Sequence, residues 1–105
     1  EAVVCADDAI AFGVMVAFDA LGIRVPEDVL VVGYHDSAIA RTTMPRLTSV
    51  RAPFERIVSE CLRLLASGPA GGAAETTDAS GGNVRAPRVM LAPQLIVRDS
   101  SVFRR

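Results

Sequence analysis

The stretch Val25–Pro53, VPEDVLVVGYHDSAIARTTMPRLTSVRAP, decides the fold. Within it, Val29–Tyr34 is a continuous β-branched and apolar run, which is typical of a buried parallel strand. Leu47–Val50 predicts a third short strand or an extended crossing, and Ser37–Pro45 between them predicts at most a short helix. In open α/β sheets ligands bind beyond the carboxyl ends of the strands, and residues 34–36, Tyr-His-Asp, occupy that position here.

The residues upstream complete a βαβ unit. Ala2–Ala6 is a continuous apolar run, which predicts a strand buried on both faces. A helix is expected to follow from about Asp8 to Leu21, with Asp7 or Asp8 as its N-cap. Gly22 suits the left-handed residue after the last turn. The apolar positions of this helix fall on one face, and they are Ile10, Val14, Ala17, Phe18 and Leu21.

Downstream, Pro53 begins a second predicted helix that ends near Ala66. Its apolar stripe consists of Phe54, Ile57, Val58, Cys61, Leu62 and Leu65. Residues 67–87 are rich in Gly, Ala and Ser and have no apolar face, which predicts a flexible loop. Arg88–Leu91 and Gln94–Arg98 favour extended segments, and Asp99–Arg105 favours a frayed tail.

Composition limits the possible functions. The 105 residues suit one small domain, and a net charge of −1 gives this segment no electrostatic basis for binding nucleic acid. Cys5 and Cys61 lie apart in apolar runs, so we expect two buried thiols in a reducing cytoplasm. With one His and no Gly-rich phosphate loop, neither a metal nor a cofactor is expected. Because the chain opens directly in a core strand, we expect it to be a piece of a longer protein.

Four polar residues follow the first two strands. Asp7 and Asp8 end one strand, and His35 and Asp36 end the next. If the strands are parallel, all four side chains emerge at the same edge of the sheet. In one interpretation Asp8 caps the helix and Asp36 caps the next turn, while Asp7 and His35 are solvated. In the other, the four form the polar rim of a small-molecule cleft.

Two further groups of residues leave alternatives open. Phe12 and Met15 fall outside the apolar stripe of the first helix, so they either pack at its side or form an exposed patch for subunit contact. Arg41, Arg46 and Arg51 could form a basic patch, but acidic neighbours favour a solvated face.

Four segments, in this order, closely resemble the C-terminal part of lactose-repressor-type (LacI/GalR) bacterial transcription regulators. They are CADDAIAFG, LGIRVPEDVLVVGYHDSAIAR, PRLTSVRAP and APQLIVRDS, and together they lie within residues 3–53 and 89–100. The resemblance implies an α/β fold of the periplasmic-binding-protein-like type (type I), a parallel sheet with flanking helices. Residues 1–50 would form mostly the C-terminal lobe. Residues 51–98 would hold a crossing segment and the last helix and strands of the other lobe.

The resemblance also implies a function. The chain would be the effector-sensing and dimerisation part of a cytoplasmic regulator that binds a sugar or nucleoside-like molecule between two lobes. Operator DNA would be contacted only through an N-terminal headpiece outside this chain. A sugar-binding protein of an ABC-type transporter shares the fold and is the alternative. An enzyme is not expected, because no nucleophile accompanies the polar edge.

Three effector-facing positions depart from the family pattern. Asp7 stands where the family has Asn, His35 stands for the first of two Asp residues, and Ala52 stands for a Gln, while Asp36 is retained. The resemblance assigns effector contacts to these four residues, but the departures mean that a common hexose cannot simply be carried over. The resemblance places the homodimer interface at Phe12, Thr42, Thr43 and Met44.

Overall fold

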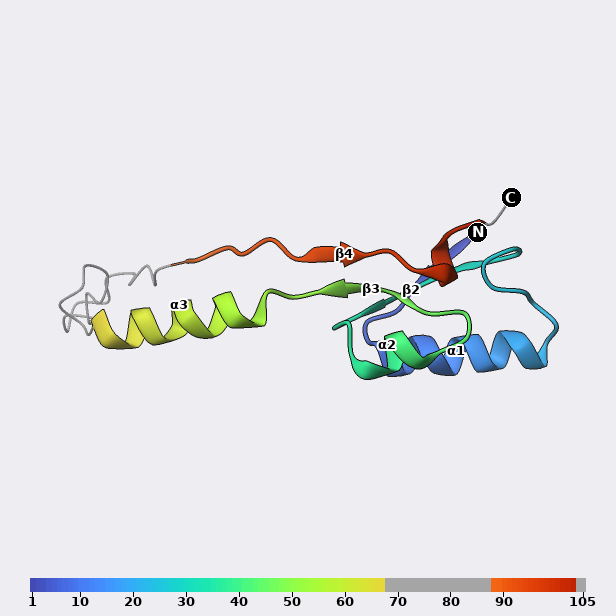
Figure 1. Ribbon diagram of the computed structural model, residues 1–105, viewed down its shortest axis with the longest axis horizontal. Helices are drawn as coiled ribbons and strands as arrows, with labels where there is room; N and C mark the ends of the chain where they lie inside the picture. Colours follow the sequence, from blue (N-terminus) through green and yellow to red (C-terminus); the bar gives the residue numbers. More distant parts are fainter. Residues whose placement is uncertain (68–87, 104–105) are drawn as a thin grey trace, which may run out of the picture. The chain divides into compact units, whose positions relative to one another are not determined.

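The computed structural model describes residues 1–67 and 88–103 (Figure 1). These residues form two compact units, one made of residues 1–52 with 93–103 and the other of residues 53–67 with 88–92. The first unit holds a sheet with two α-helices, and the second holds one long helix. Apart from Ser67, the expected flexible loop lies outside the described residues.

Four strands form one sheet in the order β1-β2-β3-β4. The first three are parallel and β4 is antiparallel to β3, with Val3 opposite Val31 and Gly33 opposite Ser49. The carboxyl ends of β1, β2 and β3 therefore meet at one edge, and the predicted α/β fold is confirmed. The strands are β1 (Ala2–Val4), β2 (Leu30–Tyr34), β3 (Thr48–Arg51) and β4 (Gln94–Ile96).

Helix α1 (Asp8–Ala20) connects β1 to β2, and Gly22 follows its C-cap Leu21 with a φ of 73°, left-handed as predicted. Its buried residues are Asp8, Ala11 and Met15. The predicted stripe is therefore wrong at both ends, since Ile10 and Leu21 are 55% and 73% exposed. Ala11 is fully buried against the sheet, because a small side chain lets the helix approach closely.

The side chains of the sheet are more exposed to solvent than the apolar sequences of its strands predict. Val31 at the centre of β2 is fully buried, but Val4 at the end of β1 is 76% exposed. Among the described residues, α1 and the short helix α2 (Ala38–Thr42) contact each other and lie on the same side of the sheet (Figure 1). The prediction that β1 is buried on both faces is therefore wrong for this structure.

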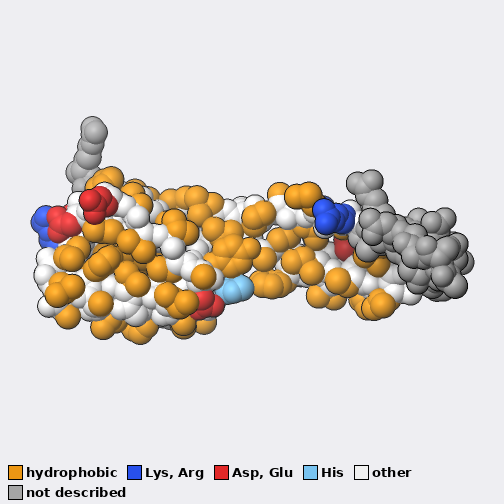
Figure 2. Space-filling view, turned by 180° about the vertical axis from the view of Figure 1, so that it is seen from behind, with side chains coloured by type: hydrophobic (Ala, Val, Ile, Leu, Met, Phe, Trp, Pro, Cys, Tyr) orange, Lys and Arg blue, Asp and Glu red, His pale blue; other side chains and the backbone are white. Residues whose placement is uncertain are grey.

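The second unit contains α3 (Phe54–Ser67), close to the predicted bounds. None of its residues is buried, and its apolar stripe is exposed, with Leu62 and Leu65 at 61% and 77%. Cys61 is exposed as well, which corrects the expectation of two buried thiols, whereas Cys5 is buried. Apolar side chains cover much of the face seen in Figure 2. Within the described ranges, no helix is long and apolar enough to cross a membrane.

In the C-terminal segment, the pairing of β4 with β3 joins Gln94–Ile96 to the first unit. Arg88–Leu91 forms no strand. The short helix η1 (Asp99–Ser101) is not a frayed tail, because Ser100 is fully buried. The division of the chain between two lobes stays a prediction.

Candidate functional site

Two polar side chains lie side by side where β1 and β2 end. Asp7 caps α1, since its carboxylate accepts a hydrogen bond from the Ala9 amide at 2.6 Å. Its other carboxylate oxygen lies 3.6 Å from Nε2 of His35. The two side chains are 41% and 47% exposed, respectively. The His35 ring also packs edge-on against Tyr34, with ring centroids 5.0 Å apart. The strand ends thus present a carboxylate and an imidazole to solvent.

Asp8 is buried beneath this edge and does not cap the helix. Its Oδ1 accepts a hydrogen bond from Ser49 Oγ, and its Oδ2 accepts one from the Ser37 amide, both at 2.6 Å. Gly33 makes this position possible, because a Cβ there would lie 2.3 Å from Asp8 Oδ1. Asp8 therefore joins α1 to the turn after β2 and to β3, and its role is structural.

Asp36 is buried and binds three arginines, of which Arg98 is largely buried and Arg41 and Arg51 are exposed. Its carboxylate accepts hydrogen bonds from Arg51 Nε at 2.7 Å, from Arg41 Nη2 at 3.3 Å and from Arg98 Nη2. The side chain of Asp36 has no exposed surface. Burial by itself would raise the pKa of this carboxyl group, but the hydrogen bonds from Arg98 and Arg51 outweigh it and hold the pKa below its usual range.

This geometry corrects the interpretation of the arginines as a solvated face. The Asp36 carboxylate is fully buried in this structure, and its assignment to the effector stays a prediction. Arg41 and Arg51 bind Asp36, so they do not form a merely solvated face. Arg46 pairs with Asp99 at 3.0 Å, away from this group. Sequence reasoning missed Arg98, since its partner Asp36 lies 62 residues earlier in the chain.

Ala52 follows β3 directly and is partly buried. Its methyl group has no hydrogen-bonding capacity. Of the four residues assigned to the effector, Asp7 and His35 are therefore the two with accessible polar atoms. In the described part of the chain, no group of three His, Cys, Asp or Glu side chains could hold a metal ion.

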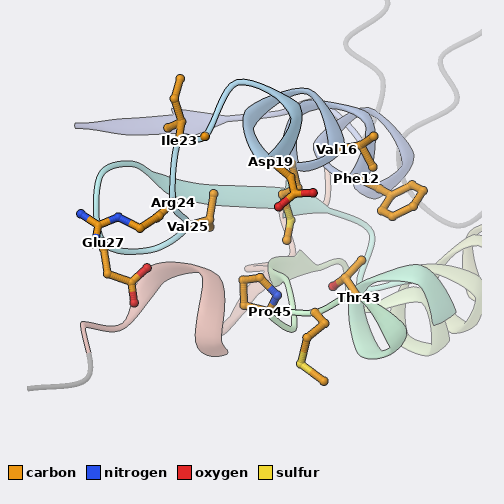
Figure 3. A pocket seen from close by; sticks show the side chains of 12 residues that line it. Phe12, Val16, Asp19, Ile23, Arg24, Val25, Glu27, Thr43 and Pro45 are labelled. Atoms are coloured by element: carbon orange, nitrogen blue, oxygen red, sulfur yellow. The ribbon is translucent and has the colours of Figure 1, made fainter.

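A separate groove of about 460 Å³ lies on the first unit (Figure 3). It holds three of the four residues assigned to the dimer interface, Phe12, Thr43 and Met44. Phe12 and Met44 are 47% and 93% exposed, whereas Met15 is buried and serves packing. Thr43 is buried, and its Oγ1 has no hydrogen-bond partner within the described residues. Thr42 lies outside the groove and bonds to carbonyl groups of its own helix.

The sequence matches the periplasmic binding protein-like domain family over residues 1–101, in agreement with the mainly parallel sheet and its helices. The HTH-type regulator YvdE of Bacillus subtilis is 38% identical over 96% of this chain and 29% of its own length. The chain belongs to the LacI family of transcription regulators. It spans less than a third of the length of YvdE and of the regulator CelR of Thermobifida fusca, two curated relatives that it matches.

Solved structures agree with this assignment. The complex of the transcriptional regulator CelR with cellobiose is 39% identical and superposes with a TM-score of 0.75, over 95% of this chain and 28% of that one. The lac repressor dimer, bound to operator and an anti-inducer, is 28% identical with a TM-score of 0.73, over 95% of this chain and 31% of that one.

Proposed function

We propose that this chain is the effector-sensing and dimerisation part of a DNA-binding transcription regulator. The observation that carries the proposal is the Asp7–His35 pair, a half-exposed acceptor and donor at the carboxyl edge of parallel strands. Edges of this kind are where open α/β sheets bind ligands. The effector would be a sugar or a nucleoside-like molecule, whose hydroxyl groups both donate and accept hydrogen bonds. That CelR was solved with cellobiose supports a sugar as the first candidate.

The intact protein would act in the cytoplasm and contact operator DNA through an N-terminal headpiece. The names of YvdE and CelR support a regulator over the solute-binding protein of a transporter and over an enzyme. A net charge of −1 agrees with a sensing segment that does not itself bind DNA.

The groove of Figure 3 supports the homodimer. Figure 3 shows Phe12 and Val16 of α1 on one side and Thr43 and Pro45 on the other. The groove is lined by both charged and apolar side chains, and the exposed apolar side chains Phe12 and Met44 are of the kind that marks contact sites. A second copy would cover Phe12 and Met44 and could give the buried Thr43 hydroxyl a partner.

A thermal-shift screen of the intact protein tests the proposal. The panel contains mono- and disaccharides, cellobiose among them, and nucleosides. A ligand at a hundred times its Kd stabilises the folded state by about 2.7 kcal/mol, so at least one compound should raise the Tm by several degrees. A polyol matched in concentration controls for general solvent effects. No specific shift with any compound would count against a sugar or nucleoside effector.

A further inference from the structure

The turn that presents His35 has an unusual backbone. His35 and Asp36 follow one another with φ of 95° and 51°, in the left-handed region that non-glycine residues seldom adopt. Such a backbone persists only where the surrounding structure fixes it. The approach of His35 to Asp7 and its edge-on contact with Tyr34 both start from this backbone.

The contacts that fix the turn converge on Asp36. Its amide donates a hydrogen bond to Ser49 Oγ at 2.9 Å, in addition to the bonds that its carboxylate accepts. Those come from Arg41 in α2, Arg51 at the end of β3 and Arg98 just after β4. Guanidinium groups only donate hydrogen bonds, so they need an acceptor such as a carboxylate at this place.

Arg98 has a second hydrogen-bond partner in addition to Asp36. Its guanidinium also donates to the Leu47 carbonyl at 2.8 Å, and its side chain is 14% exposed. Arg51 is 45% exposed and Arg41 is 60% exposed, so these two are held mainly by Asp36. The carboxylate of Asp8 faces the other side of Ser49 and bonds to the same hydroxyl group. Asp36 is therefore the shared acceptor of three separate elements.

We propose that Asp36 is a positioning residue. Its buried carboxylate gathers the three arginines, and this holds the left-handed turn that sets His35 against Tyr34 and beside Asp7. It does so without touching a ligand. Its importance for effector recognition rests on the proposed function, but the geometry that it imposes on His35 does not depend on any ligand.

The test uses the single histidine and the single tyrosine of the 105-residue chain. Their ring protons give an unambiguous nuclear Overhauser effect (NOE), because no other His or Tyr exists in the sequence. In Asp36→Asn, an NH₂ group that only donates hydrogen bonds replaces one carboxylate oxygen, so the guanidinium groups lose one of their acceptors. We expect the His35–Tyr34 NOE to fall severalfold, while the amide spectrum and the helix content of α1 are kept.

Asp99→Asn is the matched control, because it removes the Arg46–Asp99 ion pair at 3.0 Å and should leave the NOE intact. If Asp36→Asn does not fold, Arg51→Gln provides the second variant. It removes hydrogen bonds to Asp36 but leaves Arg98 in place, and the NOE should weaken in the same direction. An unchanged NOE in a folded Asp36→Asn or Arg51→Gln chain would overturn the inference. That result would leave effector binding by the intact protein untouched.

Discussion

At the scale of single residues, two glycines have opposite surroundings. A Cβ on Gly33 would lie 2.3 Å from Asp8 Oδ1 and 2.9 Å from Leu47 Cδ2. A Cβ on Gly13, on the exposed side of α1, would meet nothing within 4 Å. The absence of a side chain is therefore required at Gly33 and is merely tolerated at Gly13.

Gly33→Ala should destabilise the chain by about 1–3 kcal/mol, the usual cost of overpacking a core. Gly13→Ala should stabilise it by about 0.5–1 kcal/mol, because alanine loses less backbone entropy in a helix. Urea unfolding followed by circular dichroism measures both. Equal effects of the two substitutions would contradict the close approach of Asp8 to β2.

The Asp36 carboxylate should make stability depend on pH. Because its pKa is lowered in the folded state, its contribution is fully present above the ordinary value of 3.8 and is lost as the pH falls below that value. At pH 7, Asp36→Asn should lower the free energy of unfolding by about 2–3 kcal/mol, because the arginines lose their ionic hydrogen bonds to the buried carboxylate. Unfolding measured between pH 7 and pH 2.5 should show this difference shrinking only below about pH 4. A difference that stays constant down to pH 2.5 would contradict the account.

The sequence predicted which residues meet at the edge but not what each one does. Asp7 and His35 meet because they end neighbouring parallel strands, and that follows from the pattern of apolar runs. The burial of Asp36 depends on Arg98, which no local pattern connects to it. The left-handed turn was also hidden, because it contains no glycine.

At the scale of elements, α1 shows where hydrophobic periodicity fails. The stripe predicted from the helical spacing of apolar residues includes Ile10 and Leu21. The buried face is instead centred on Asp8, Ala11 and Met15. A small residue and a hydrogen-bonded carboxylate allow the helix to lie close to β2, and a hydrophobicity pattern ranks both below isoleucine.

The short helix η1 is held by Ser100. Its Oγ donates to the Val31 carbonyl at 2.6 Å and accepts from the Thr48 amide at 2.8 Å, so it links β2 with β3. Ser100→Ala should cost about 2 kcal/mol, because two buried backbone groups lose their partner. Ser59→Ala, on the exposed side of α3, is the control and should change the stability by less than about 0.5 kcal/mol. Thermal unfolding compares the two variants, and similar Tm values would show that the tail is loosely attached.

At the scale of the whole molecule, the dimer prediction concerns Phe12. Removing an apolar anchor at the centre of an interface costs roughly 2 kcal/mol, or about thirtyfold in Kd. Phe12→Glu should therefore weaken self-association at least that much in sedimentation velocity. Ile10→Glu is the control, because Ile10 is 55% exposed on the same helix and does not line the groove. A wild-type chain that stays monomeric at high micromolar concentration would contradict the prediction for this chain.

The fold class and the family could be predicted because they rest on ordered motifs and buried strands, which a single sequence carries. The exposure of Val4 and of the α3 stripe could not be predicted from the sequence. Apolar patterning shows that a face can be buried, but it does not show what covers that face. The choice of effector depends on a few polar atoms at the strand ends, and two of these are changed in this chain from the family pattern.

The most direct test of effector binding at the Asp7–His35 edge is calorimetric titration of the intact protein. The ligand is the panel compound that gives the largest thermal shift. His35→Ala should weaken its binding by about 1–3 kcal/mol, roughly fivefold to 150-fold, because a buried ligand group would lose its partner. Ser59→Ala should bind like the wild type. An unchanged affinity in His35→Ala would contradict the central claim that the effector binds at this edge of the sheet.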